Sequence, residues 1–327
     1  MNLIRKAKTT KNNLSAQWQN ILIKTSLNLD KPLNKPTSVI FDLTPNCVLR
    51  CKQCDIWKNP PVKHLSYQKS KVLIDKIHSW LGESYVFFTG GEPLMNQDLP
   101  KIIKYAHKKG ILSHINSAAT LINDKVAQKL LDNHLFAISI SLDGSIPKTH
   151  DYLRGRTGTY NRAVQAIEHL QKLPSSKKPK IYINTVMMKD NVKELEELIK
   201  FASQQKTDGI SFQCLLPNLG SKNSQLSPVT NPLWPETGEM VETIKRIMKL
   251  SKSNKIVLTS PDDLNLAIQY YKDPHVLDSM TCAAGINNFI IDHLGDVRLC
   301  FEYSPIGNLF KESPAKIWWS KKSQKQR

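Results

Sequence analysis

The sequence predicts a protein of the α/β class, built around a parallel sheet of six strand-helix units. Two observations support this. Short runs of β-branched and aromatic residues alternate with longer segments whose apolar residues recur every three or four positions. That alternation is typical of βαβ units, whose crossovers are right-handed. At 327 residues, the chain is also long enough for one large α/β domain and an appendage.

The expected elements follow one another in a regular order after a basic, Asn-rich leader over residues 1–36. Strands are expected near residues 38–43, 85–89, 111–116, 135–141, 181–187 and 209–215. Amphipathic helices are expected near residues 66–81, 98–109, 123–133, 159–173 and 191–205. In the last helix, apolar residues recur at helical spacing, at Val192, Leu195, Leu198, Ile199 and Ala202. Periodicity alone leaves open whether the sheet closes into a barrel.

The charge balance is strongly basic, with 46 Lys and Arg against 28 Asp and Glu, a net charge of +18. Such a balance attracts nucleic acid or anionic membranes when it is concentrated in one place. Here the lysines are scattered, which favours a solvated basic surface and no specific nucleic-acid partner. No apolar run approaches the roughly 18 residues of a membrane span, and the chain opens without an apolar signal segment. We therefore expect a soluble cytoplasmic protein without a transmembrane segment.

Three cysteines, Cys47, Cys51 and Cys54, follow the first expected strand directly. Three thiolates are one ligand short of a filled tetrahedral site, and an iron-sulfur cluster held by three cysteines keeps one iron open to a small molecule. A structural zinc site is the alternative, but it needs a fourth ligand, and His64 is the sole nearby candidate. Disulfides are less expected, because thiols stay reduced in a cytosol.

A second motif ends the next strand, where Thr89 is followed by Gly90, Gly91 and Glu92. In a β/α barrel the carboxyl ends of the strands form the functional face. Glycines there let a ligand touch the backbone, and a carboxylate accepts hydrogen bonds from an ammonium group. The two motifs together predict a binding site at this face.

With these two motifs in this order, the chain resembles the radical S-adenosylmethionine (radical SAM) enzymes, from about Val39 to Trp319. The resemblance implies an open, partial (β/α)6 barrel of the TIM type. It implies that the three cysteines hold a [4Fe-4S] cluster whose open iron chelates S-adenosyl-L-methionine. A one-electron donor such as flavodoxin or ferredoxin is implied as a partner. The products would be methionine and a 5′-deoxyadenosyl radical that abstracts hydrogen from a substrate.

The same resemblance assigns the cofactor-binding residues. Gly90, Gly91 and Glu92 match the stretch that receives the amino group of the cofactor in that family. Ser141, at the end of the fourth strand, and Arg154 match a serine and an arginine of the peptide-modifying members. We expect both to converge on the cofactor's carboxylate, which suits the fork geometry of Arg.

Three further positions carry alternatives or depart from the family pattern. Gln53 stands where the family commonly has an aromatic residue. Ser117 lies in a segment that lacks the family's usual glycine. Asp143, followed by Gly144, is equally consistent with a simple turn and with a functional role at the end of the fourth strand.

The remaining cysteines lie in the second half of the chain. Cys214 ends the sixth strand and is expected to be a buried small hydrophobe. Cys282 and Cys300 flank an expected hairpin over residues 288–300, with a tight turn at Gly295-Asp296. This region resembles the start of a SPASM or twitch extension, which carries auxiliary iron-sulfur clusters, and we place it at 236–327, after a core at 37–235.

The number of clusters follows from these cysteines. Two thiolates cannot fill a four-ligand cluster, so we expect one cluster in this chain. Cys282 and Cys300 stay candidate ligands of an auxiliary cluster. A missing cysteine-bearing end, help from Cys214 or from a non-cysteine ligand, and a lost auxiliary cluster remain open as explanations.

The sequence thus predicts a radical SAM enzyme that modifies a peptide or protein. A small-molecule enzyme similar to the molybdopterin-precursor cyclases is the alternative within the same class. A non-catalytic iron-sulfur or zinc-binding module is the alternative outside it. Because function belongs to the site and not to the fold, the substrate rests on the resemblance of the C-terminal extension alone.

Overall fold

The computed structural model describes residues 21–327 except 23–24, 30–31, 175–176, 217–227 and 281. One curved sheet of nine strands organises this part of the chain, in the order β6-β5-β4-β3-β2-β1-β7-β8-β9. The six strands that form the predicted units are parallel. Their bounds are Ser38–Asp42 for β1, Ser84–Thr89 for β2, Ile111–Ser117 for β3, Ala137–Ser141 for β4, Lys180–Met187 for β5 and Gly209–Cys214 for β6. The predicted α/β fold with a parallel sheet is confirmed.

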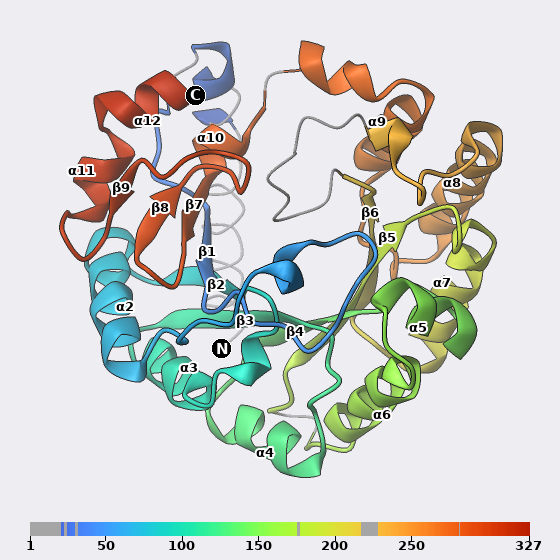
Figure 1. Cartoon of the computed structure of the whole chain (residues 1–327), viewed down its shortest axis with the longest axis horizontal. Coiled ribbons are helices and arrows are strands. Elements are labelled where there is room, and N and C mark those ends of the chain that lie inside the picture. The colour runs from blue at the N-terminus through green and yellow to red at the C-terminus, as the bar shows by residue number, and fades with distance from the viewer. Residues whose placement is uncertain (1–20, 23–24, 30–31, 175–176, 217–227, 281) are drawn as a thin grey trace, which may run out of the picture.

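The helices of the five predicted segments also form, and each lies between two successive strands in the sequence. They are α2 over Tyr67–Leu81, α3 over Leu99–Lys108, α4 over Asp124–Asp132, α6 over Thr159–Gln171 and α7 over Leu195–Gln204. Figure 1 shows the strands curving round the centre of the molecule with these helices on the outer side. The sheet is open, because β6 and β9 are its two edges.

Local sequence explains where these helices begin and end. For α2, the side chain of Ser66 accepts a hydrogen bond from the backbone N–H of Lys69, and Gly82 ends the helix at a φ of 73°. Leu73, Ile74 and Ile77 of α2 are buried, at the spacing that places them on one face. This face packs into the main apolar core with β1 and β2.

Further helices stand outside the five predicted segments. α5 over Pro147–Arg154 follows β4, α8 over Thr237–Ser253 and α9 over Pro261–Lys272 follow β6, and α10 to α12 span Ala284–Asn287, Pro314–Trp318 and Lys321–Gln326. Of these, α5 matters most for the site, because it carries Arg154 at its last position.

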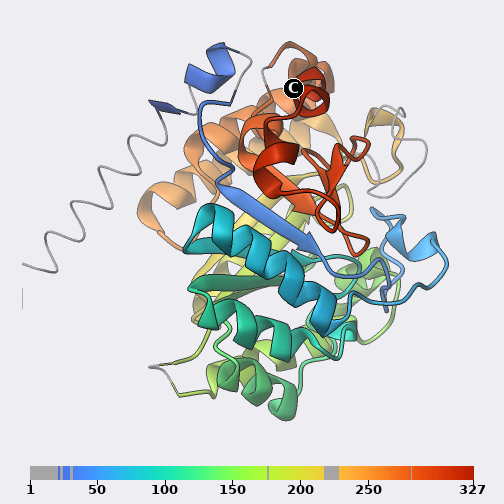
Figure 2. The same cartoon turned by 90° about the vertical axis from the view of Figure 1, so that its left-hand side faces the viewer.

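The C-terminal region continues the sheet. β7 over Asn288–Ile291 pairs in parallel with β1, and β8 over Asp296–Arg298 pairs antiparallel with β7 through a turn at Gly295, whose φ is 80°. The predicted hairpin is therefore confirmed. β9 over Gly307–Asn308 completes the sheet. Figure 2 shows β1 between α2 and this C-terminal region. The boundaries predicted after residues 36 and 235 stay predictions.

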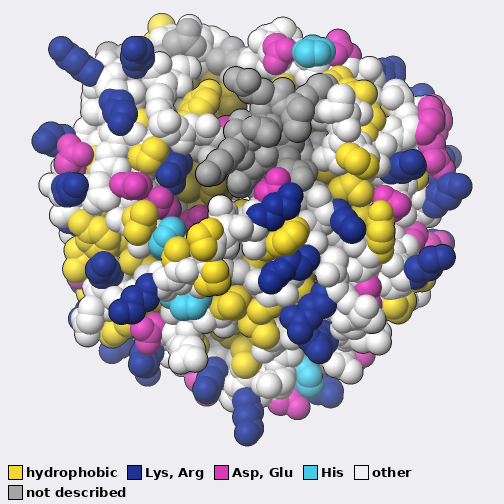
Figure 3. All heavy atoms as spheres, in the orientation of Figure 1, with side chains coloured by type: hydrophobic (Ala, Val, Ile, Leu, Met, Phe, Trp, Pro, Cys, Tyr) yellow, Lys and Arg dark blue, Asp and Glu magenta, His cyan; other side chains and the backbone are white. Residues whose placement is uncertain are grey.

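Aromatic packing holds this region in place. Trp318 is fully buried, its ring contacts those of Trp80 and Phe289, and its indole N–H donates to the backbone carbonyl of Asn34. Lys and Arg side chains are spread over the face seen in Figure 3 and interspersed with Asp and Glu. In the described part of the chain, no helix is apolar over a stretch long enough to cross a membrane.

Candidate functional site

The loop that carries the three cysteines leaves β1 and is fixed at both ends. On one side, the backbone N–H groups of Gly91 and Glu92 donate to the carbonyls of Thr44 and Asn46. On the other side, the N–H groups of Arg50 and Lys52 donate to the carbonyls of Arg154 and Leu153 at the end of α5. The loop is therefore held between the end of β2 and the end of α5.

Glycine is required where these segments meet. A Cβ atom on Gly90 would lie 2.2 Å from the carbonyl oxygen of Thr44, and the φ of Gly90 is 136°. A Cβ on Gly91 would lie 2.3 Å from the carbonyl oxygen of Asn46. Cβ atoms cannot approach backbone oxygens so closely, so these two glycines allow the second motif to dock on the cysteine loop.

The three thiols line one cavity of about 240 Å³ at the carboxyl ends of the strands. Other predicted residues line it too, namely Gly90, Gly91, Ser141 and Arg154. The structure therefore brings together seven of the eight positions that the sequence assigns to the first cluster and the cofactor. The eighth, Glu92, does not line the cavity.

Glu92 lies beneath the glycines and is fully buried. Its carboxylate accepts hydrogen bonds from the hydroxyl of Ser117 at 2.7 Å, from the N–H of Ala118 at 2.9 Å and from the N–H of Leu94 at 3.1 Å. Burial raises the pKa of Glu92, and these hydrogen bonds oppose that effect. Its contacts tie the end of β3 to the end of β2, and they give Ser117 a structural partner.

Arg154 also lines the cavity. Its guanidinium makes an ion pair with Asp143 at 2.7 Å and lies 3.9 Å from the sulfur of Cys51. Gln53, the residue that departs from the family pattern, donates to the same carboxylate oxygen of Asp143 at 2.9 Å. Asp143 is therefore more than a turn residue, since it links the cysteine loop to β4 and α5.

The thiols are in a dry environment. Burial raises the pKa of the Cys47 and Cys54 thiols to about 11. Burial also raises the pKa of Cys51, although the positive charge of Arg154 opposes this effect. Soft thiolate donors grouped round a partly apolar cavity are suited to an iron-sulfur cluster, which displaces their protons when it binds.

His64, the fourth ligand of the zinc alternative, does not line this cavity, and its Nδ1 lies 2.8 Å from the hydroxyl of Thr44. Within the described residues, no three side chains of His, Cys, Asp or Glu are grouped as a site for a single metal ion.

The other three cysteines lie elsewhere. Cys214 ends β6, is partly buried against the main core, and lines a separate cavity with Phe212 and Tyr270. Burial raises the pKa of its thiol to about 12. Cys214 therefore packs against the core as a hydrophobe, but it is only partly buried and not fully buried as expected. Cys282 is exposed and Cys300 is partly exposed, and both are free thiols.

Three polar residues that sequence reasoning did not single out line the cavity beside the three thiols. Asn116, Asn184 and Gln213 lie at or near the carboxyl ends of β3, β5 and β6. The sequence signal is clearest for Asn116 and Gln213, which each precede the last residue of a strand, whereas Asn184 lies within β5.

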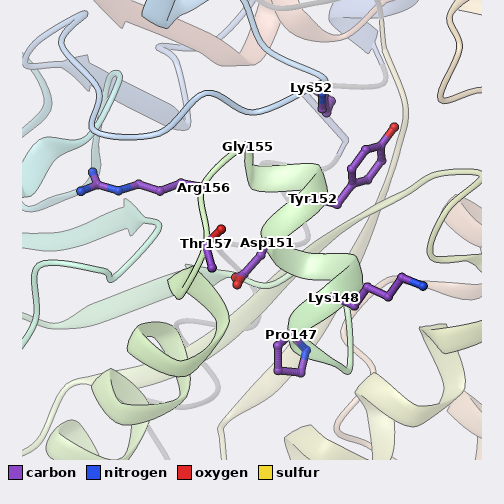
Figure 4. Close-up of a pocket in the computed structure, with 8 residues that line it drawn as sticks. All are labelled: Lys52, Pro147, Lys148, Asp151, Tyr152, Gly155, Arg156 and Thr157. Atoms are coloured by element: carbon purple, nitrogen blue, oxygen red, sulfur yellow. The ribbon is translucent and has the colours of Figure 1, made fainter.

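A shallow depression on the surface lies next to α5 and is distinct from the cavity, with which it shares no residue (Figure 4). Lys52, Lys148 and Tyr152 contribute to it. Its carboxylate, Asp151, accepts hydrogen bonds from the N–H groups of Gly158 and Tyr160 at the start of α6. Asp151 is thus occupied in joining two helices.

Comparison with known families identifies two regions of the chain. A model of the radical SAM superfamily matches residues 41–202, and a model of the SPASM iron-sulfur cluster-binding domain matches residues 282–327. The first region contains Cys47 to Arg154, and the second contains Cys282 and Cys300.

Several curated proteins are similar to the chain. An AdoMet-dependent heme synthase of Methanosarcina barkeri is 25% identical over 300 residues, which cover 87% of this chain and 82% of that protein. The mycofactocin maturase MftC of Mycolicibacterium smegmatis is 29% identical over 274 residues, which cover 83% of this chain and 66% of that protein. The Fe-coproporphyrin III synthase of M. barkeri is 32% identical over 203 residues, which cover 59% of this chain and 48% of that protein. The match therefore spans about half of that relative.

Solved structures share the fold. SuiB of Streptococcus suis, bound to S-adenosylmethionine, superposes with a TM-score of 0.69 at 17% identity, covering 91% of this chain and 68% of that one. anSMEcpe with bound AdoMet superposes with a TM-score of 0.65 at 17% identity, covering 89% of this chain and 83% of that one. Together with the two family matches, the fold and the motifs lead to one conclusion: the chain belongs to the radical SAM superfamily of enzymes, whose cofactors are a [4Fe-4S] cluster and S-adenosylmethionine, and its C-terminal region is of the SPASM type.

Proposed function

We propose that Cys47, Cys51 and Cys54 hold the [4Fe-4S] cluster and that the cavity beside them binds S-adenosylmethionine. The observation that carries this proposal is the convergence of the three thiols with Gly90 and Arg154 on one cavity. Held by these three thiolates, the cluster would supply the electron for reductive cleavage of S-adenosylmethionine, and thereby the means to abstract hydrogen from a substrate.

The protein residues have separate tasks in this proposal. Gly90 and Gly91 bring backbone to the cavity wall, where their polar groups are within reach of the cofactor's amino group. Arg154 and Ser141 offer donors to its carboxylate, and Arg154 has an Nε–H without a hydrogen-bond partner in the described structure. Glu92 does not contact the cofactor in this proposal. It holds the ends of β2 and β3 together through its hydrogen bonds to Ser117 and Ala118.

For the substrate we propose a peptide or protein side chain. The support is the similarity, over most of the chain, to a mycofactocin maturase, together with the fold shared with SuiB. A tetrapyrrole is the second candidate, because the similarity to heme synthases covers as much of the chain. In both cases the electron is proposed to come from a protein such as flavodoxin or ferredoxin.

The test is anaerobic reconstitution of the chain with iron and sulfide, followed by reduction with dithionite in the presence of S-adenosylmethionine. We expect 5′-deoxyadenosine from the wild type and from Cys214→Ala, whose thiol lies outside the cavity. We expect none from Cys51→Ala. A reconstituted wild type with a full cluster that releases no 5′-deoxyadenosine would contradict the proposal. Increased release with either a peptide or Fe-coproporphyrin III distinguishes the two substrate classes.

A further inference from the structure

A second and larger chamber, of about 670 Å³, adjoins the cofactor cavity. The two share wall residues, among them Thr89, Gly90 and Asn116. Much of the remaining wall is apolar, with Ile40, Phe87, Ile290 and Phe301 among its residues. A molecule in this chamber would therefore lie next to the cofactor.

Asp42, the last residue of β1, is a carboxylate in this chamber wall. Its Oδ1 is shielded from solvent and has no hydrogen-bond partner in the described structure. This oxygen lies beside Gly90, because a Cβ there would be 2.7 Å from it. The side chain of Asp42 thus lines a largely apolar wall without a full set of hydrogen-bond partners, and a carboxylate in such a place favours a ligand that donates to it.

The neighbouring charges decide which kind of ligand fits. Asp292, at the end of β7, forms an ion pair with Arg298 at 2.7 Å, and so the positive charge of Arg298 is already balanced. The other carboxylate oxygen of Asp292 accepts hydrogen bonds from the N–H groups of Leu294 and Asp296. Burial lowers the pKa of His293, so its ring is neutral at neutral pH. Two acidic residues therefore line this wall. Asp292 is paired with Arg298, whereas no cation of the described structure forms an ion pair with Asp42.

We propose that this chamber binds the substrate and that Asp42 receives a protonated basic nitrogen carried on an apolar part of it. The inference rests on the proposed function, because the chamber is defined by its place beside the cofactor cavity. It favours a peptide with a lysine, an arginine or a free amino terminus over a tetrapyrrole, whose side chains are carboxylates.

The electrostatics of Asp42 agree with this assignment. Burial, followed by the charge of Asp292, raises the pKa of Asp42 to about 7, while a hydrogen bond from the N–H of Thr44 and the charge of Arg298 oppose the rise. A bound cation stabilises the ionised carboxylate and therefore lowers this pKa. Binding of a cation should in turn strengthen as the pH rises through about 7.

The test uses three probes of one shape, 2-phenylethylamine, 2-phenylethanol and 3-phenylpropionate. Each is titrated by ligand-observed NMR into the anaerobically reconstituted enzyme with S-adenosylmethionine bound. We expect the amine to bind more tightly than the alcohol by roughly 10-fold or more, and the anion to bind most weakly. In Asp42→Asn the advantage of the amine over the alcohol should vanish. In Asp132→Asn, which changes an exposed carboxylate at the end of α4, it should persist.

Phe301→Ala locates the binding independently. Phe301 lines the chamber and is 48% exposed, so its truncation leaves the core intact. Phe301→Ala should weaken the binding of the amine and the binding of the alcohol by the same factor. This variant keeps the test decisive if Asp42→Asn fails to fold.

The outcomes separate the two proposals. Tightest binding of the anion, an amine preference that survives Asp42→Asn, unequal effects of Phe301→Ala, or no binding of any probe would each overturn the assignment of the chamber. Release of 5′-deoxyadenosine is measured on the same preparations. Its absence from the wild type counts against the proposed function, whereas its presence without an amine preference counts against this inference alone.

Discussion

Arg154 and Asp143 form an ion pair at 2.7 Å in which the side chain of Asp143 is fully buried and that of Arg154 is 10% exposed. The pair joins the end of α5 to the end of β4. Burial lowers the pKa of Arg154, but the charge of Asp143 together with the interactions with Cys51 and Cys54 outweighs this effect, and the pKa of Arg154 is raised overall. The guanidinium is thus held in its charged form, next to Cys51.

Asp143→Asn should destabilise the protein by about 3–5 kcal/mol, because it leaves a buried guanidinium without its counter-charge. Chemical denaturation under anaerobic conditions measures the free energy of unfolding. The double variant Asp143→Leu with Arg154→Met removes both charges and should recover much of that loss. A single variant as stable as the wild type would show that the pair is solvated in solution.

Arg154→Ala should weaken the binding of S-adenosylmethionine roughly 10- to 150-fold, as expected for the loss of a charge-assisted hydrogen bond of about 1.5–3 kcal/mol. Equilibrium titration gives the dissociation constant. The control is Arg162→Ala, since Arg162 is exposed on α6 and does not line the cavity. An unchanged dissociation constant in Arg154→Ala would refute its role at the cofactor.

Cys51→Ala should empty the cluster site, because no other described cysteine lines that cavity besides Cys47 and Cys54. Iron and sulfide are assayed after anaerobic purification. Cys214→Ala, the matched cysteine outside the cavity, should keep its full content. A complete cluster in Cys51→Ala would sink the assignment of the ligands.

Replacing both Cys282 and Cys300 with Ala should leave iron at about four per chain, the content of one [4Fe-4S] cluster. The physical reason is that Cys282 and Cys300 are the only thiols of this region, and two thiolates cannot fill a four-ligand cluster. Reconstituted wild type serves as the reference. About eight irons in the wild type and about four in the variant would instead establish a second cluster in the SPASM region.

His150 should make the protein less stable in acid. Burial lowers its pKa to about 3, and its Nδ1 accepts a hydrogen bond from the N–H of Asp143. The unfolded chain, with a histidine pKa near about 6.5, binds a proton that the folded chain does not, so stability falls as the pH drops below that value. His150→Asn, which keeps an acceptor and does not titrate, should flatten the decline in melting temperature between about pH 6.5 and 5. An equal decline in both proteins would contradict this.

The sequence predicted the six parallel strands to within two residues, because their apolar runs and the helices between them are long and regular. It also predicted which residues meet at the cysteine loop. The roles of Gln53 and Asp143 were not predictable, since they are 90 positions apart and their contact depends on the curvature of the whole sheet. Asp42 was read as part of a strand, and its unpartnered oxygen becomes visible only with β7 beside it.

The pairing of β7 with β1 sets an order of events during synthesis. β1 leaves the ribosome some 250 residues ahead of Asn288–Ile291, its partner on one side, which is the distance in sequence from Ser38 to Asn288. Until then, one edge of β1 exposes unpaired backbone groups and is open to mispairing. Contacts so remote in sequence form slowly. Anaerobic expression should therefore benefit from slow translation at low temperature, and removing the C-terminal strands should produce aggregation instead of a smaller soluble enzyme.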